Sequence, residues 1–109
     1  MQQTRTTPAI QLVGASGSSW QFESYPTSTS WNHVPCVYVV ARLTPERRYA
    51  ILYVGETEDI ADRLSNHHKA QCFRRNGCTH ILVHQERSER TRRLIEADLI
   101  RNYGPACND

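Results

Sequence analysis

Apolar and polar residues alternate in two short segments near the start of the chain, residues 10–13 and 20–25. The residues between them are glycine, alanine and serine, a composition that is typical of turns. This pattern predicts a β-hairpin. We expect residues 1–35 to form an N-terminal hairpin extension that packs on a core formed by residues 36–109.

Short apolar runs predict the strands of the core. Residues 36–43 and 49–54 are mostly apolar, and the short turn-like segment 44–48 between them favours an antiparallel pair. A third strand is expected over residues 78–84. We therefore predict an α/β fold, in detail an α+β sandwich, in which helices flank a small, mostly antiparallel sheet of three strands.

Helical periodicity begins after Gly55, where Thr57 is a candidate N-cap. Arg63 and His67 are four residues apart, so the prediction places them one above the other on this first helix. An irregular basic stretch is expected to follow it.

A second helix is predicted from its cap Ser88 to about Tyr103, because Gly104 and Pro105 then end it.

Length and composition indicate one compact domain. The chain has 109 residues, of which 39% are hydrophobic and 22% are charged. Its apolar runs are too short to cross a membrane, so we expect no membrane partner. The first residues lack the apolar stretch of a secretory signal and the four cysteines are irregularly spaced, which favours a cytoplasmic, intracellular location.

Positive charge is concentrated in the second half of the chain. The formal net charge is only +2, but residues 63–93 contain eight lysines and arginines against two glutamates. Such a cluster attracts polyanions, although helices also carry arginines simply as a solvated face. Charge alone therefore suggests a nucleic-acid partner but does not distinguish it from a solvated helix face.

The predicted last helix contains one carboxylate on an apolar arc. Leu99, Ile100 and Tyr103 lie three, four and seven residues after Glu96, so this side chain projects among them. A carboxylate in such surroundings needs a partner. A metal ion is one candidate, and an ion pair with Arg92, one turn earlier, is the other.

A zinc site is a further alternative, because Cys72, Cys78, His80 and His84 are close in sequence. The spacing of the two cysteines does not match that of structural zinc ligands, and residues 78–84 are better explained as the third strand.

The order of the polar residues resembles that of the GIY-YIG nuclease domain. Val37-Tyr38 and Tyr53-Val54-Gly55 stand where that family has its two name-giving motifs, and the other members of the pattern follow: Arg63, His67, Glu96 and Asn108. The resemblance covers residues 36–109. Two positions depart from the pattern: Cys36 replaces the first glycine, and Glu56 stands where some members have a lysine.

The resemblance implies a metal-dependent endonuclease that hydrolyses DNA phosphodiester bonds. Tyr38 would be the general base for the attacking water, and Tyr53 its hydrogen-bonded helper. Arg63 would stabilise charge on the phosphoryl oxygens, His67 would act as a second phosphate-side donor or proton relay, and Asn108 would orient a tyrosine or close the pocket.

Glu96 would hold a single Mg²⁺ or Mn²⁺ ion. Four residues are expected to contact nucleic acid: Gly55, Lys69, Arg74 and Arg75. The expected partner is double-stranded or branched DNA, with RNA as an alternative, and the chain would act as a monomer or a homodimer. The competing function is a catalytically silent module that binds nucleic acid or protein on the same scaffold.

Overall fold

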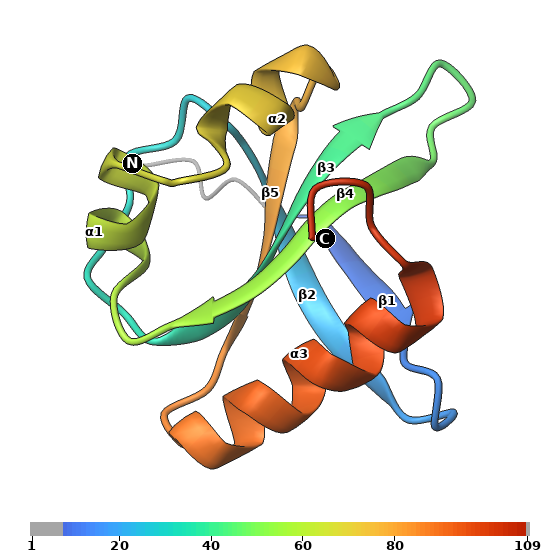
Figure 1. Cartoon of the computed structure of the whole chain (residues 1–109), viewed down its shortest axis with the longest axis vertical. Coiled ribbons are helices and arrows are strands. Elements are labelled where there is room, and N and C mark those ends of the chain that lie inside the picture. The colour runs from blue at the N-terminus through green and yellow to red at the C-terminus, as the bar shows by residue number, and fades with distance from the viewer. Residues whose placement is uncertain (1–7, 109) are drawn as a thin grey trace, which may run out of the picture.

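A computed structural model describes residues 8–108 of the chain as one antiparallel sheet and three helices (Figure 1). The strands are β1 (Ala9–Val13), β2 (Ser19–Pro26), β3 (Cys36–Leu43), β4 (Tyr49–Thr57) and β5 (His80–Gln85). The helices are α1 (Ile60–Ser65), α2 (Ala70–Arg75) and α3 (Glu89–Tyr103).

The sheet has five strands in the order β1-β2-β5-β3-β4, so the prediction of a three-stranded sheet is wrong. The N-terminal hairpin forms as predicted, but β2 pairs with β5, for example through Ser24 and Leu82. The hairpin thereby continues the core sheet. Period-two patterning identifies strands and carries no information on which distant strands pair, which explains the difference.

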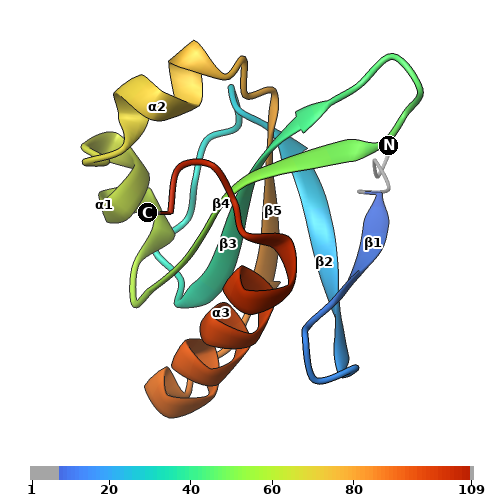
Figure 2. The same ribbon diagram turned by 45° about the vertical axis from the view of Figure 1, so that its right-hand side comes forward.

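Side chains alternate between the two faces of the sheet, and each face has its own core. The first core packs against α3 and contains aliphatic side chains of β3 together with Phe22, Leu82, Ile95 and Leu99. The second contains Tyr38, Tyr53 and Phe73, and α1 and α2 cover it. In Figures 1 and 2, α1 and α2 lie on one side of the β3–β4 ribbon and α3 lies on the other.

Helix α3 has the predicted limits. The Ser88 hydroxyl accepts a hydrogen bond from the Thr91 N–H, and Gly104 ends the helix in the left-handed conformation with φ of 50°. The buried carboxylate of Asp98 on this helix accepts hydrogen bonds from the Ser16 N–H at 3.0 Å and the Ser16 hydroxyl at 2.6 Å. These bonds attach the turn of the N-terminal hairpin to α3.

The first two helices differ from the prediction. Asp59, and not Thr57, caps α1, because its carboxylate accepts from the Asp62 N–H at 2.9 Å while Thr57 ends β4. The helix ends at Ser65, so Arg63 and His67 do not share it. The stretch expected to be irregular contains α2.

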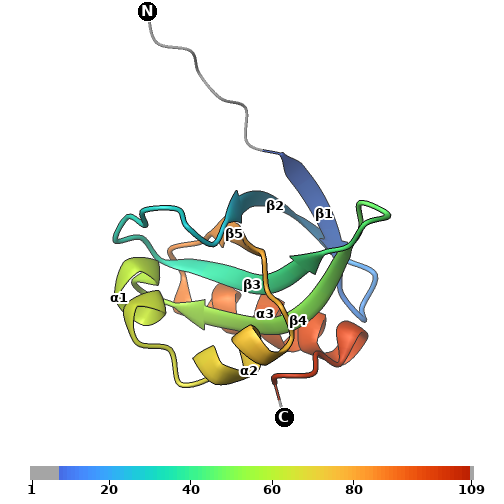
Figure 3. The ribbon, with the colours of Figure 1, turned by 90° about the horizontal axis from the view of Figure 1, so that it is seen from above.

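The chain end is attached along β4. The Cys107 N–H donates to the Leu52 carbonyl at 2.9 Å, and a disulfide joins Cys107 to Cys72 of α2. Figure 3 shows the segment after α3 running toward α2. The disulfide was not predicted. Because such bonds persist mainly in oxidising compartments, it weighs against a cytoplasmic location, which stays a prediction. No helix among the described residues is long and apolar enough to span a membrane.

We predict that loss of the Cys72–Cys107 disulfide lowers the free energy of unfolding. The bond closes a loop with a sequence separation of 35 residues. Such a loop is expected to contribute about 3 to 4 kcal/mol through the entropy of the unfolded chain. Urea unfolding of Cys72→Ser with Cys107→Ser measures the loss. Cys78→Ser, at a half-buried free cysteine, is the matched control, and equal stabilities of the two variants would contradict the prediction.

Candidate active site

The candidate site begins at a glycine with no room for a side chain. Gly55 of β4 lies directly opposite Tyr38 of β3. A Cβ on Gly55 would lie 2.6 Å from Cζ and Oη of Tyr38 and 2.8 Å from Cε2 of Tyr53. Both rings therefore occupy the space above this residue, and any larger residue would displace them.

Tyr38 and Tyr53 lie on the same face of the sheet. Tyr53 pairs with Val40, so the two tyrosines are diagonal neighbours across β3 and β4, and their ring centroids are 6.0 Å apart. Tyr38 is fully buried and Tyr53 is 8% exposed. Burial is the main cause that raises the pKa of each hydroxyl above its usual value.

His67 makes the shortest contact with Tyr38. Its Nε2 lies 2.7 Å from the Tyr38 hydroxyl oxygen, while its Nδ1 accepts a hydrogen bond from the Lys69 N–H at 3.0 Å. A neutral imidazole that accepts at Nδ1 carries its proton on Nε2. His67 is therefore the donor and the Tyr38 oxygen is the acceptor. Although His67 lies beyond α1, the turn after that helix still brings it to Tyr38.

The surroundings of His67 keep it neutral. Its ring packs on Phe73 at 4.8 Å and on Tyr53 at 5.1 Å, and it stacks on His68 at 4.9 Å. Burial, assisted by the nearby positive charges of His68, Arg63 and Lys69, lowers the pKa of His67 to about 4. At neutral pH the Nε2–H therefore remains a fixed hydrogen-bond donor.

Arg63 reaches the tyrosines from α1. Its Nη1 donates to the Glu56 carbonyl at 3.3 Å, which holds the guanidinium beside β4. Its charge acts against the effect of burial and lowers the pKa values of Tyr38 and Tyr53. Arg63 thus interacts with both tyrosines, as predicted, although α1 is shorter than the predicted helix.

Glu96 lies on α3 and interacts electrostatically with Tyr53 and Arg63. Its carboxyl is half-buried, and burial followed by the negative charge of Glu56 raises its pKa, while the positive charges of Arg93 and Arg63 partly counter this effect. The charge of Glu96 in turn raises the pKa of Tyr53. Among residues 8–108, no ion pair is formed by Glu96.

The alternative ion pair between Arg92 and Glu96 is wrong. Arg92 is 3% exposed, and its Nε donates to Oε1 of Glu56 at 2.8 Å. Its Nη1 also donates to the carbonyls of Glu86 and Arg87. Arg92 therefore neutralises Glu56 and forms no ion pair with Glu96.

Asn108 binds the backbone beside Tyr53. Its Oδ1 accepts from the Val54 N–H at 2.8 Å, and its Nδ2 donates to the Val54 carbonyl at 2.9 Å. This pair of bonds satisfies both polar groups of one residue on the outer edge of β4. Asn108 thus fixes the strand that carries Tyr53.

The residues expected to contact nucleic acid lie in different surroundings. Gly55 is buried under the tyrosines, and Lys69 is half-buried just before α2. Arg74 and Arg75 are exposed on α2. The cations of residues 63–93 therefore do not form one surface, since Arg92 and Arg93 on α3 pair with glutamates.

Within the described part of the chain, no group of three or more His, Cys, Asp or Glu side chains is placed to hold a metal ion. The zinc alternative is further weakened because Cys72 is in the disulfide. A hard ion such as Mg²⁺ often uses one or two protein carboxylates and completes its shell with water and phosphate. The half-buried carboxylate of Glu96 fits that kind of binding.

Two features of the site were not predicted from the sequence. The packing of Tyr38 over Gly55 could have been predicted, because both residues lie near the same end of the predicted antiparallel strand pair. The Glu56–Arg92 ion pair had no local signal, because these residues are 36 positions apart.

No protein-family model, curated protein or solved structure matches the chain. The geometry of the site therefore carries the functional argument.

We predict that His67 makes the protein less stable in mild acid. Its pKa is about 4 in the folded protein and about 6.5 in the unfolded chain. The unfolded state therefore binds more protons between these values, and stability falls as the pH is lowered from 6.5 toward 4. Urea unfolding across this range should show a shallower fall in His67→Gln than in the wild type. Parallel curves, or an NMR titration of His67 near pH 6.5, would contradict the assignment.

Proposed function

We propose that the chain is a metal-dependent endonuclease that hydrolyses DNA phosphodiester bonds by water attack, with the GIY-YIG residue pattern as its catalytic set. The observation that supports it most is the meeting of two phenols, an imidazole and a guanidinium above Gly55, with Glu96 close enough to shift the pKa of Tyr53. These groups come from β3, β4, α1, the turn after α1, and α3.

Glu96 is the residue that would hold Mg²⁺ or Mn²⁺. Its carboxyl is half-buried and forms no ion pair within residues 8–108, so a bound cation would offset the cost of ionising it. A divalent ion bound there would neutralise charge on the phosphoryl oxygens and on the leaving oxygen. Because a single carboxylate holds it, binding of the ion is expected to be weak without nucleic acid.

Arg63 supplies the charge stabilisation that belongs to the protein itself. Its guanidinium is partly buried and held at Glu56, and it presents further N–H groups beside the tyrosine hydroxyls. A phosphate at this position would be bound by fixed donors that need no rearrangement as negative charge grows.

The two tyrosines divide the work of the general base. Tyr38 has no exposed surface, so the attacking water cannot reach its hydroxyl directly. Tyr53 is the less buried of the two and adjoins Tyr38. We assign Tyr53 the contact with water. In the reactive form the Tyr38 proton has first been released to solvent, and the Nε2–H of His67 and the charge of Arg63 stabilise the phenolate that remains. As the water attacks, its proton passes to the Tyr53 oxygen while the Tyr53 proton passes to this phenolate, so that both tyrosines end the step as phenols.

Duplex or branched DNA is the proposed substrate, and RNA is the alternative. The exposed arginines of α2, Arg74 and Arg75, lie on the helix that also packs Phe73 against Tyr53 and His67. Their charge would attract the phosphates of a strand bound at the tyrosines.

A silent binding module on the same scaffold is the second candidate function. Retention of both Arg63 and Glu96 favours the enzyme.

We predict that Glu96→Gln abolishes metal-dependent nicking. Supercoiled plasmid and branched duplexes are incubated with Mg²⁺, Mn²⁺ or EDTA, and nicked product is measured. Loss of the metal-binding carboxylate should lower the rate by about 100-fold or more. Glu89→Gln is the control, since Glu89 is exposed on the same helix and pairs with Arg93. DNA binding in EDTA without product in either metal, on every substrate, would favour the silent module.

We predict that Arg63→Lys affects turnover more than binding. Lysine keeps the positive charge but not the planar fork of donors, so the transition state loses directed hydrogen bonds. The turnover rate should fall about 100-fold, while affinity for DNA in EDTA changes by about threefold or less. Arg75→Lys on α2 is the matched control. An equal loss of affinity and rate would show that Arg63 serves mainly to bind substrate.

A further inference from the structure

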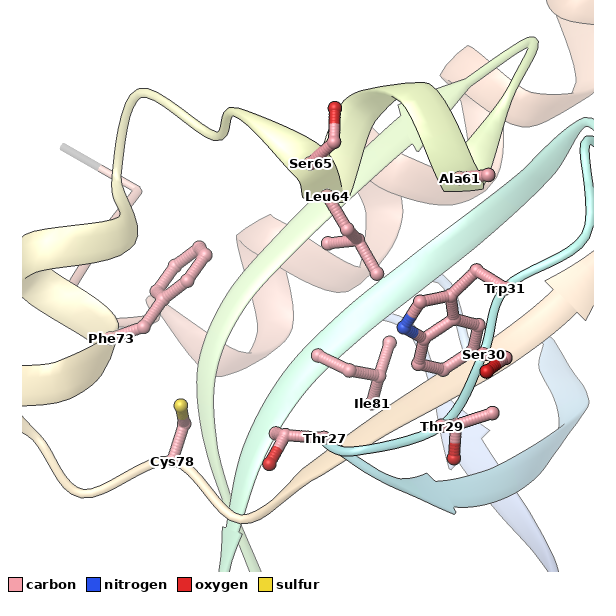
Figure 4. Close-up of a pocket in the computed structure, with 10 residues that line it drawn as sticks. All are labelled: Thr27, Thr29, Ser30, Trp31, Ala61, Leu64, Ser65, Phe73, Cys78 and Ile81. Carbon is pink, nitrogen blue, oxygen red and sulfur yellow. The ribbon is translucent and has the colours of Figure 1, made fainter.

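An open cavity of about 560 Å³ lies beside the candidate active site. It is bounded by α1, α2, the connector after β2 and the start of β5, as Figure 4 shows. The largest side chains in its wall are Trp31, Leu64, Phe73 and Ile81. Its size is within the range of about 300 to 1,000 Å³ that is common for ligand pockets.

The cavity is in direct contact with the catalytic group. Phe73 lines it and also packs on Tyr53 at 5.4 Å and on His67 at 4.8 Å. Leu64 follows Arg63 on α1. A group in the cavity would therefore be one side chain away from the tyrosines that face the scissile phosphate.

The wall of the cavity suits a flat heterocycle. Trp31 is fixed by an edge-on contact with Tyr25 at 5.7 Å, and in Figure 4 its indole nitrogen faces the space between Leu64 and Ile81. None of the hydrogen bonds found within the described residues uses this N–H. Hydroxyl groups of Thr27 and Ser30 lie at the rim. Aromatic and aliphatic surface with a few polar edge groups is the usual setting for an unstacked base.

The charges around the cavity favour a strand of nucleic acid over a peptide. All the residues that line it are uncharged. Arg74 and Arg75 follow Phe73 directly and are exposed, and Arg63 precedes Leu64. An apolar pocket whose lining residues Leu64 and Phe73 have three arginines next to them along α1 and α2 matches a ligand that joins an aromatic ring to phosphates.

We propose, building on the proposed action on nucleic acid, that this cavity receives one unpaired nucleobase of the strand that is cut, next to the scissile phosphate. Turning a paired base out of a duplex costs free energy, and this cost is smallest where the base is already unpaired. The pocket would thus direct the protein to bulged, branched or damaged duplexes. It supplies a target choice that depends on DNA structure and needs no additional domain.

The test is a binding measurement in EDTA, where metal-dependent cleavage cannot occur. End-labelled duplexes carry a single unpaired adenine or, at the same place, an abasic site, and affinities are measured by fluorescence anisotropy. The wild type should bind the unpaired adenine about fivefold or more tightly than the abasic site, as expected for one stacked base. Equal affinities would overturn the proposal.

Two variants assign the preference to the cavity. Trp31→Ala removes the stacking ring, and Ala61→Phe fills the space from α1 without removing an aromatic residue. Both should bind the two duplexes equally. Trp20→Ala is the matched control, since Trp20 packs against the core under α3, on the other face of the sheet, and it should keep the preference. A preference retained in both cavity variants would overturn the proposal.

The outcome can be separated from that of the endonuclease proposal. A protein that prefers the unpaired adenine in EDTA but produces no nicks with Mg²⁺ or Mn²⁺ would contradict the nuclease and support the base pocket. A protein that nicks DNA yet does not distinguish adenine from an abasic site would contradict the pocket alone.

Discussion

The missing side chain of Gly55 is the constraint on which the site depends. Because β3 and β4 pair with Tyr38 opposite Gly55, the Tyr38 ring can lie across β4 and place its hydroxyl near the edge of the sheet. The same space accepts the edge of Tyr53. His67 and Arg63 then need only reach this one position. A methyl group here would separate the phenols and remove the shared target of the imidazole and the guanidinium.

A second constraint is the distribution of ion pairs on α3. Arg92 lies one turn before Glu96 on this helix. It forms an ion pair with Glu56 and donates hydrogen bonds to two backbone carbonyls instead. Removing one member of a buried ion pair strongly destabilises the folded protein, because the other charge is left buried without a partner. Arg92 therefore cannot easily leave Glu56 to pair with another residue. Glu56 thus draws the arginine away from Glu96. Glu56 is in this way the reason that Arg92 forms no ion pair with the proposed metal ligand Glu96.

Much of the fold could be predicted from the sequence because its signals are local. Alternation located the hairpin strands, short apolar runs located the core strands, and Ser88 and Gly104 indicated the limits of α3. The order of the polar residues predicted that Tyr38 and His67 lie together. The failures involve choices made at a distance. Nothing near β2 or β5 in the sequence shows that they pair, and nothing near Cys72 shows that Cys107 is its partner.

The position of His67 shows that two residues predicted to lie together can do so although the local structure predicted for them was partly wrong. Helical spacing placed it above Arg63, yet α1 ends at Ser65. The turn that follows supplies what a helix could not, because the Lys69 N–H binds Nδ1 and so fixes the proton on Nε2, toward Tyr38. The local backbone therefore sets the imidazole tautomer. A histidine on a continuous helix could have reached the tyrosine, but its Nδ1 would have had no such donor, and its direction of hydrogen bonding would have remained open.

The two faces of the sheet have different cores. The face under α3 is filled mainly by aliphatic side chains, and Asp98 of α3 binds the turn of the N-terminal hairpin. The other face carries the tyrosines, and its covering helices are only six residues long. Short helices cannot fill such a surface, which is why an open cavity remains next to the phenols. The disulfide and Asn108 hold the chain end on this side and stabilise α2 and β4, so that the cavity and the tyrosines keep their relative positions.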